Sequence, residues 1–319
     1  MSGSPAWIHA ATLLAASILA GIGGEMFVRG VIGTAARWRL SELMVAMTIA
    51  ACATSAPELT VAIVASAEGH SALALGDALG SNVTNILLIL GAALLFGRMA
   101  ANPDAMRRHL AWAIAVPVAT CGLLADGTLS GWDGGLLLLG FAAWLTMTVV
   151  GIRRARAGVA AEPDGAPAPR PLALIALLVG GVAVLAVAGR LFATGGRALA
   201  ELFGFPEAVV GATVVALGTS MPELMTTLIS RWRGHHEIGV GTLLGSNLFN
   251  GLAILGTAAV ISPIHPPLPP VWVVLAAGVL AVILVVPRRE GLGRWRGVTM
   301  LACYALYVAA LAAAPGPGI

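Results

Sequence analysis

The chain contains two copies of one segment, separated by a constant 165 residues. The copies cover residues 48–91 and 213–256, align without a gap and are identical at nearly half of their positions. Each copy places a glutamate directly after a proline within an apolar stretch: Glu58 in the first copy and Glu223 in the second. A duplicated half with a polar, proline-interrupted helix in each copy is typical of secondary transporters, whose site lies near the membrane midplane.

The composition excludes a soluble domain with a charged surface. Hydrophobic residues make up 58% of the chain, charged residues only 10%, and the mean hydropathy is +0.92. We therefore expect a polytopic membrane protein, embedded in a lipid bilayer. All 18 basic residues are arginines, and most fall in expected loops, where they set membrane orientation. Nucleic acid is not an expected partner. The three cysteines have no metal-ligand spacing and are interpreted as packing residues, and no cofactor is expected.

The fold class predicted is all-α, with ten transmembrane helices. Ten apolar stretches approach the roughly 20 residues that cross a bilayer. Their approximate cores are 8–33, 43–66, 72–97, 109–125, 133–152, 171–194, 207–230, 238–260, 270–287 and 298–314. Nearly all loop arginines follow odd-numbered spans, whereas the other connections hold Glu68, Asp126, Asp133 and Glu201. The odd connections are therefore expected to be cytoplasmic, with both termini outside, in the inner (plasma) membrane.

Five spans in each half is an odd number, so the second copy must enter the membrane from the opposite side. The sequence thus predicts two inverted repeats, residues 1–152 and 171–319, each with five transmembrane helices. Between them, residues 153–170 are rich in proline, alanine and glycine and are interpreted as a cytoplasmic linker.

The two glutamates are the strongest candidates for function. An uncompensated charge midway along a membrane helix costs at least ~2.5 kcal/mol, and neither repeat helix carries a basic residue nearby. The proline before each glutamate lacks an N–H, so it frees carbonyl groups one turn back. Hydroxyl groups precede each glutamate by four and three residues, on the same helix face. These residues are Thr54 and Ser55 in the first copy, and Thr219 and Ser220 in the second.

The following span repeats a second motif, Gly-Ser-Asn-x-x-Asn. Ser81 and Asn85 are four residues apart and face one way, as do Ser246 and Asn250. Glycines at 76, 80, 241 and 245 are small residues that favour close helix approach, with simple helix packing as the alternative reading. The asparagines at 82 and 247 are equally open between packing and function. Together the motifs assemble only oxygen ligands, which suit Ca²⁺ or several Na⁺ ions and disfavour zinc and copper.

The paired Thr-Ser-x-Pro-Glu and Gly-Ser-Asn-x-x-Asn motifs resemble those of the calcium/cation antiporter superfamily, in its sodium/calcium exchanger branch. The resemblance covers both repeats and the ten-span plan. It implies that Glu58 and Glu223 are the central ligands of the ion, with Asn85 and Asn250 beside them. It also implies oxygen ligands from Thr54 and Thr219, carbonyl ligands from Ala51 and Ala216, and Na⁺ sites at the motif serines. Those serines are Ser55, Ser81, Ser220 and Ser246.

The same resemblance implies that the spans at 8–33 and 171–194 are long, tilted and mobile. Two positions depart from the family pattern. Some relatives have Asp where this chain has Asn250, and Thr242 stands where an Asn or Asp matching Asp77 is expected.

The expected function is exchange of Na⁺ for Ca²⁺ by alternating access, normally with Ca²⁺ extrusion, so Ca²⁺ and Na⁺ are its transported partners and the protein is not an enzyme. A proton-coupled or K⁺-dependent cation exchanger is the nearest alternative, and a channel is another. An intramembrane hydrolase is disfavoured because the histidines lie in loops or at a span end, with no Ser–His pair at membrane depth. The sequence leaves the oligomeric state open.

One further expectation concerns charges inside the first and sixth spans. Glu25 and Arg190 occupy equivalent positions under the 165-residue offset. We expect them to form an ion pair where the two helices cross, with separate snorkelling of each side chain to an interface as the alternative.

Overall fold

The computed structural model describes residues 5–99, 103–157, 170–202, 216–266, 268–286 and 291–313. These residues are almost entirely helical, and the only β-structure among them is two isolated bridges between loops. The prediction of an all-α fold is confirmed. The three cysteines are free and half-buried, as expected for packing residues.

The helices of the first half lie within residues 6–157. They are α1 (Ala6–Trp38), α2 (Glu42–Val45), α3 (Ala51–Thr54), α4 (Ala56–Ala67), α5 (Ser71–Val83), α6 (Gly91–Leu95), α7 (Pro103–Leu123) and α8 (Gly131–Ala157). The second half contains α9 (Pro171–Leu202), α11 (Ala216–Thr219), α12 (Met221–Trp232), α13 (His236–Leu248), α14 (Leu255–Ile261), α15 (Leu268–Val285) and α16 (Arg294–Ala313). Three π-helical turns join some of them: η1 (Ala46–Ala50), η2 (Thr84–Leu90) and η5 (Phe249–Ile254).

The duplication extends to the helix boundaries. Adding 165 to the bounds of α4 and α5 gives the bounds of α12 and α13, and the turn η5 begins where η2 predicts. The expected linker 153–170 lies largely outside the described residues, as do residues 207–215 of the seventh predicted span.

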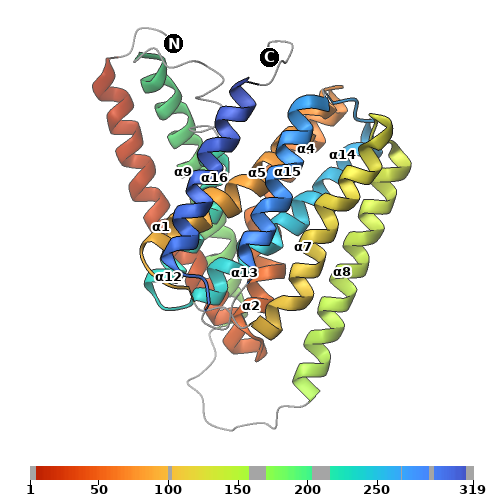
Figure 1. The fold of residues 1–319 in the computed structure, drawn as a ribbon. Coiled ribbons are helices and arrows are strands. Elements are labelled where there is room, and N and C mark those ends of the chain that lie inside the picture. The colour runs from red at the N-terminus through yellow and green to blue at the C-terminus, as the bar shows by residue number, and fades with distance from the viewer. Residues whose placement is uncertain are drawn as a thin grey trace.

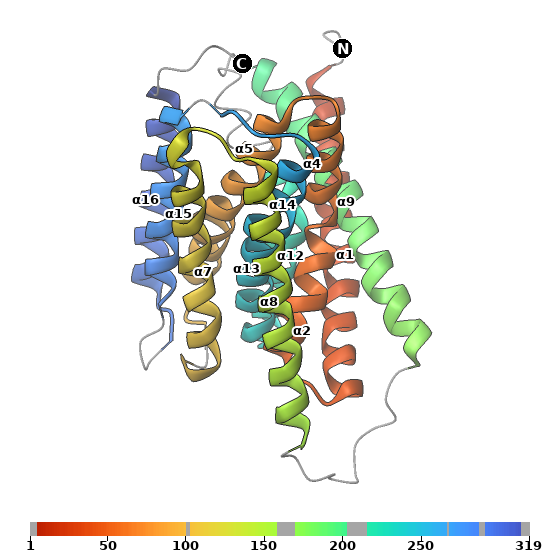
Figure 2. The ribbon, with the colours of Figure 1, turned by 90° about the vertical axis from the view of Figure 1, so that its right-hand side faces the viewer.

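The helices α1 and α9 stand together at one side of the molecule, apart from α7 and α8 (Figures 1 and 2). They are copies of each other, yet they run antiparallel. A β-carbon added to Gly23 would meet Leu185, and one added to Gly30 would meet Leu178. The residue number rises along α1 while that of its neighbour on α9 falls, so the two helices are antiparallel. The centre of the molecule is α13, whose residues are buried from Ile238 to its end (Figure 2).

By length and apolar composition, six helical segments among the described residues can cross a membrane. The pair formed by α2–α3 and α4, which is bent by 43°, makes a seventh. The other expected spans fall on α12, α15 and α16.

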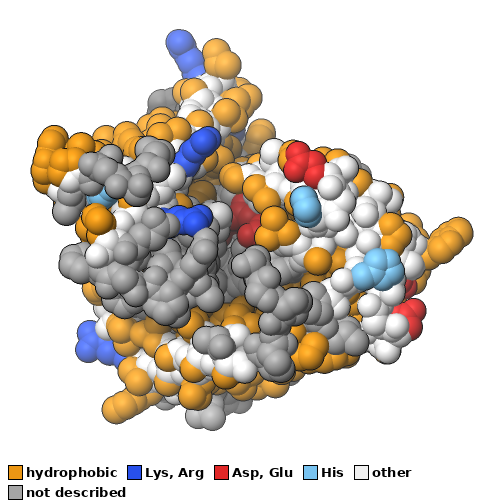
Figure 3. All heavy atoms as spheres, turned by 90° about the horizontal axis from the view of Figure 1, so that it is seen from above, with side chains coloured by type: hydrophobic (Ala, Val, Ile, Leu, Met, Phe, Trp, Pro, Cys, Tyr) orange, Lys and Arg blue, Asp and Glu red, His pale blue; other side chains and the backbone are white. Residues whose placement is uncertain are grey.

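The connections sort to two ends of the molecule. At one end, a bridge joins Met99 to Leu292, and the Arg231 side chain donates to the carbonyl oxygen of Arg98. At the other end, a bridge joins Leu129 to Ile264. The first group lies in connections expected on the cytoplasmic side and the second in connections expected outside. Seen from the end where α1 begins, most of the visible acidic and histidine side chains lie over one half of the face (Figure 3).

The expected ion pair between Glu25 and Arg190 is absent from this structure, so that prediction was wrong for this conformation. The Glu25 carboxylate instead pairs with Arg29, one turn along α1 at 2.6 Å, and with Arg233 after α12. Arg190 is exposed on α9. Glu25 therefore links α1 to the connection between α12 and α13 through Arg233. Arg29 lies one turn further along α1 and Arg233 lies in a loop, so both are close enough to pair with Glu25.

Close helix approach is realised at the glycines of the second copy. A β-carbon on Gly245 would lie 2.3 Å from the Met47 carbonyl oxygen, and one on Gly241 would lie 2.9 Å from the Ala46 β-carbon. These contacts press α13 against η1, which belongs to the first half. In the first copy, no described residue lies within 4 Å of a β-carbon at Gly76, and only the Tyr307 hydroxyl lies near Gly80, at 3.8 Å.

We expect Gly245→Ala to destabilise the protein, because the methyl group meets a backbone oxygen that cannot rotate away. Overpacking of this kind costs about 1–3 kcal/mol, so the melting temperature in detergent should fall by several degrees. Gly135→Ala is the matched control: it lies within α8 with no described neighbour in reach of a new β-carbon. Its melting temperature should stay equal or rise slightly, since alanine favours helix. Equal behaviour of the two variants would show that the α13–η1 contact is not tight.

Candidate functional site

Each glutamate follows a break in its helix. The breaks lie at Ser55 and Ser220, whose backbones have left helical geometry in the same way, with φ −90° and ψ 9° at Ser55 and φ −85° and ψ 16° at Ser220. A new helix begins at the next residue, so Glu58 and Glu223 lie in the first turns of α4 and α12. The partial positive charge at a helix N-terminus favours a carboxylate there. The proline-interrupted helices predicted from the sequence are thus genuine breaks.

The two motif asparagines lie in π-helical turns. Asn85 is in η2 and Asn250 is in η5. A π turn widens the helix by one residue and frequently occurs at functional sites. Both side chains are only 1% exposed. The Gly-Ser-Asn-x-x-Asn motifs therefore carry their last asparagine into the interior at a widened turn, which the helical periodicity of the sequence did not predict.

The Glu223 carboxylate is held by hydroxyl groups from both halves of the chain. Its Oε1 atom accepts hydrogen bonds from Ser55 Oγ at 3.3 Å and from Ser246 Oγ at 3.1 Å. The hydroxyl of Thr54 lies 3.3 Å from that of Ser246. Residues 168 positions apart therefore meet at one carboxylate, and the two motifs assemble into a single site.

The Glu58 carboxylate is 3% exposed and lies in a more negative environment. The charges of Glu223 and of Asp77, which is half-buried on α5, both act on it repulsively. Two carboxylates buried near each other in an apolar interior need positive charge to compensate them. Asp77 was not among the candidate ligands predicted from the sequence, although its spacing of eight residues from Asn85 places both on one helix face.

The remaining candidates flank this centre. Ser81 and Ser220 are buried, and Thr219 ends α11 just before the second break. The carbonyl oxygen of Ala51 lies one turn before the first break and accepts from Thr54 Oγ1 at 3.2 Å and from the Ser55 N–H at 3.0 Å. Ala216 begins α11, and its side chain lies outside the described part of the structure.

Four buried oxygen atoms of the site find no hydrogen-bond donor among the described residues. They are Glu58 Oε2, Glu223 Oε2, Asn85 Oδ1 and Asn250 Oδ1. Buried polar atoms without partners are rare because each costs about 1–3 kcal/mol. Buried, unpaired oxygens from carboxylates and amides are the ligand chemistry of hard cations such as Ca²⁺ and Na⁺. The described residues contain no cluster of histidine, cysteine and acidic side chains suited to a softer metal.

Comparison with known proteins agrees with this chemistry. The family described as sodium/calcium exchanger protein matches residues 8–150 and 173–313. The inner membrane protein YrbG of Escherichia coli K12 is 38% identical over 69% of this chain and 70% of its own length. The sodium/calcium exchanger MaX1 of Methanosarcina acetivorans is 25% identical over 91% of this chain and 94% of its own.

The solved structure of the sodium-calcium exchanger NCX_Mj, soaked with Na⁺ and Sr²⁺, superposes with a TM-score of 0.79. It is 26% identical and covers 96% of this chain and 99% of its own. The fold and site thus define a membrane cation antiporter. The chain belongs to the sodium/calcium exchanger family, and the resemblance inferred from the two motifs is confirmed.

We expect Glu58→Gln and Glu223→Gln each to raise the melting temperature of the protein in cation-free detergent by several degrees. A neutral amide removes a buried charge and relieves the repulsion between the two carboxylates. Addition of Ca²⁺ should then raise the melting temperature of the wild type but not of either variant. Glu68→Gln, an exposed acid after α4, is the control and should behave as wild type in both conditions. A Ca²⁺-dependent shift that survives in the variants would place the divalent cation elsewhere.

Proposed function

We propose that this protein is a secondary active antiporter that exchanges Na⁺ for Ca²⁺ by alternating access, normally moving Ca²⁺ out of the cell. The four buried, unpaired oxygens of Glu58, Glu223, Asn85 and Asn250 carry this proposal. A centre with this much uncompensated negative charge, enclosed by helices from both halves, suits a cation that binds, is occluded and leaves. Two of the similar proteins, MaX1 and NCX_Mj, are named as sodium/calcium exchangers, which supports the same pair of ions.

In this proposal the chain crosses the inner (plasma) membrane ten times, as two inverted repeats of five spans, residues 1–152 and 171–319. The antiparallel course of α1 and its copy α9 supports the inversion. The separation of the connections to two ends supports alternate crossing. With the arginine-bearing end inside, both termini lie outside, and residues 153–170 form a cytoplasmic linker.

Ca²⁺ takes six to eight oxygen ligands. We assign Glu58 and Glu223 as its charged ligands, with the amide oxygens of Asn85 and Asn250 and oxygens of Thr54 and Thr219 around them. We add to this set the carbonyl oxygens of Ala51 and Ala216, which lie in the short helices just before the two breaks.

The neutral oxygens favour Na⁺ over H⁺ as the coupling ion. Serine hydroxyls and asparagine amides do not carry a proton at ordinary pH, but they replace the water shell of a small monovalent cation. We assign the Na⁺ sites to the motif hydroxyls at Ser55, Ser81, Ser220 and Ser246. A proton-coupled exchanger, in contrast, needs only the two titratable carboxylates.

We expect Glu58→Gln and Glu223→Gln each to abolish ⁴⁵Ca²⁺ exchange in proteoliposomes while leaving the protein folded. Removing one of two charges from a dry dication site loses several kcal/mol of ion stabilisation, whereas the amide inserts into the membrane more easily. Glu68→Gln should transport as wild type. Near-normal exchange by either buried variant would rule out the proposed site.

We also expect an imposed Na⁺ gradient to drive Ca²⁺ uptake and membrane potential to change its rate. Two carboxylates balance one Ca²⁺; about three Na⁺, as the family resemblance implies, would leave the loaded site with a different net charge. Each charge moved is worth ~2.3 kcal/mol per 100 mV. The measurement is ⁴⁵Ca²⁺ uptake into Na⁺-loaded proteoliposomes, with voltage set by K⁺ and valinomycin. Uptake that follows a pH gradient and ignores Na⁺ would favour proton coupling, and uptake without any opposed gradient would indicate a channel.

A further inference from the structure

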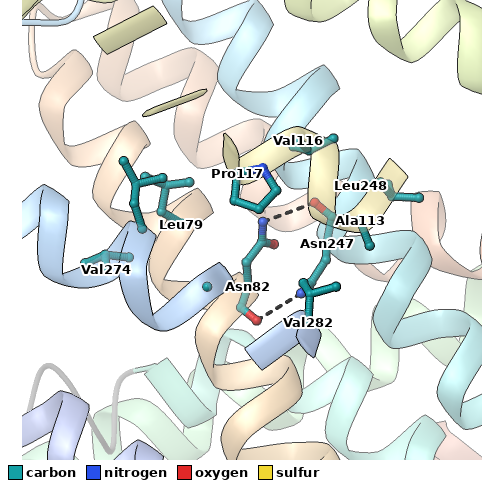
Figure 4. A pocket seen from close by; sticks show the side chains of 11 residues that line it. Leu79, Asn82, Ala113, Val116, Pro117, Asn247, Leu248, Val274 and Val282 are labelled. Atoms are coloured by element: carbon teal, nitrogen blue, oxygen red, sulfur yellow. Dashed lines mark hydrogen bonds between the residues drawn. The ribbon is translucent and has the colours of Figure 1, made fainter. Parts of the chain in front are cut away.

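The middle asparagines of the two Gly-Ser-Asn-x-x-Asn motifs form a reciprocal pair across the two halves. Asn82 Nδ2 donates to the backbone carbonyl oxygen of Asn247 at 3.1 Å, and Asn247 Nδ2 donates to the carbonyl oxygen of Asn82 at 3.0 Å. Figure 4 shows the two amides reaching toward each other's backbone. The two residues are 165 positions apart, so the bonds are copies of each other. This pair marks the place where α5 and α13 meet.

The surroundings of the pair leave it few other partners. A small cavity of about 30 Å³ beside it is lined mainly by apolar side chains of α7 and α15, including Val116, Pro117 and Val274 (Figure 4). Amides in such surroundings are strongly held by the few hydrogen bonds they make, because breaking one leaves a buried polar group without a partner.

A third hydrogen bond connects this pair to the proposed ion site. Asn85 Nδ2 donates to Asn247 Oδ1 at 3.0 Å. The backbone carbonyl of Asn82 determines how the side-chain amides of Asn247 and Asn85 are oriented. The carbonyl oxygen of Asn82 can only accept, so the Asn247 amide must direct its NH₂ toward that carbonyl and its oxygen toward Asn85. Asn85 must then direct its own NH₂ toward Asn247, which leaves Asn85 Oδ1 on the opposite side, buried and without a donor among the described residues.

We propose that Asn247 is a positioning residue that presents the amide oxygen of Asn85, rather than its NH₂, to the transported cation. The inference rests on the proposed function, because it assumes that Asn85 is an ion ligand. The discrimination is chemical: the oxygen of an amide attracts a cation, and its NH₂ group repels one. Asn247 touches no ion itself and acts through Asn85.

The hydrogen bond from Asn85 to Asn247 has no equivalent between Asn250 and Asn82 in the described structure. The counterpart of Asn85 is Asn250, and the counterpart of Asn247 is Asn82. The Asn82 Oδ1 atom, which would accept from Asn250, has no hydrogen-bond partner in the described structure. Replacing Asn82 by alanine therefore removes one hydrogen bond between the halves but keeps the backbone carbonyl that orients Asn247. Asn82→Ala is thus a control for Asn247→Ala, with the same loss of side-chain volume at the equivalent position.

The test measures the Ca²⁺ concentration for half-maximal ⁴⁵Ca²⁺ uptake, and the maximal rate, in proteoliposomes. We expect Asn247→Ala to raise the half-maximal concentration about tenfold, equivalent to about 1.4 kcal/mol, and Asn82→Ala to change it less than about threefold. Asn85→Asp carries an oxygen at both ends of its side chain, so its orientation no longer matters. In the Asn85→Asp background, Asn247→Ala should therefore raise the half-maximal concentration less than about threefold.

The outcomes separate the inference from the function on which it rests. Absence of Ca²⁺ uptake by the wild-type protein would overturn the proposed function. Uptake by the wild type, with an unchanged half-maximal concentration in Asn247→Ala or with equal losses in Asn247→Ala and Asn82→Ala, would overturn the positioning role. If Asn247→Ala does not fold, Asn247→Ser takes its place. The Ca²⁺-induced rise in melting temperature is then the readout, and a rise equal to that of the wild type would also overturn the role.

Discussion

The structure depends on how two carboxylates are kept inside an apolar helical protein. Glu58 and Glu223 are each at most 3% exposed, and each has an oxygen without a donor among the described residues. An uncompensated charge in such a place opposes folding by several kcal/mol. The helix breaks at Ser55 and Ser220 offset part of this cost, because they set each carboxylate in the first turn of a helix, where backbone N–H groups point toward it. In the proposed function a bound cation offsets the rest, so binding and the stability of the centre would be coupled.

Close packing of the central helices follows from this arrangement. For oxygens of both motifs to surround one cation, α13 must approach the helix that carries Thr54 and Ser55. The glycine at 245 allows that approach, since a β-carbon there would meet the Met47 carbonyl. The π turns at Asn85 and Asn250 then widen the helices where ligands are needed. The glycine contacts, the helix breaks and the π turns therefore act together: they bring the helices close, place the carboxylates at helix N-termini and widen the helices at the asparagines.

The all-α fold and the candidate residues could be predicted from the sequence because the two copies of the duplicated segment can be aligned with each other. Identical residues at a constant offset single out Pro57, Glu58 and Asn85 and their copies, and residue types with hydroxyl, carboxylate and amide oxygens define the ion chemistry. Contacts between distant elements could not be predicted. The pairing of Glu25 with Arg29 and Arg233, in place of Arg190, depends on where the end of α12 meets α1. The bond from Asn85 to Asn247 depends on a π turn that apolar periodicity does not reveal.

The two halves carry nearly the same motifs in different environments. Glu223 accepts hydrogen bonds from Ser55 and Ser246, whereas Glu58 faces the negative charge of Asp77, whose copy in the second half is the neutral Thr242. The Asn85–Asn247 bond likewise has no copy between Asn250 and Asn82. In the proposed function, inverted repeats with identical conformations would present the centre equally to both sides of a membrane, so opening to one side alone requires the two halves to differ. We infer that the differences between the copies bear on access to the centre, while their identical residues make up the proposed ion site.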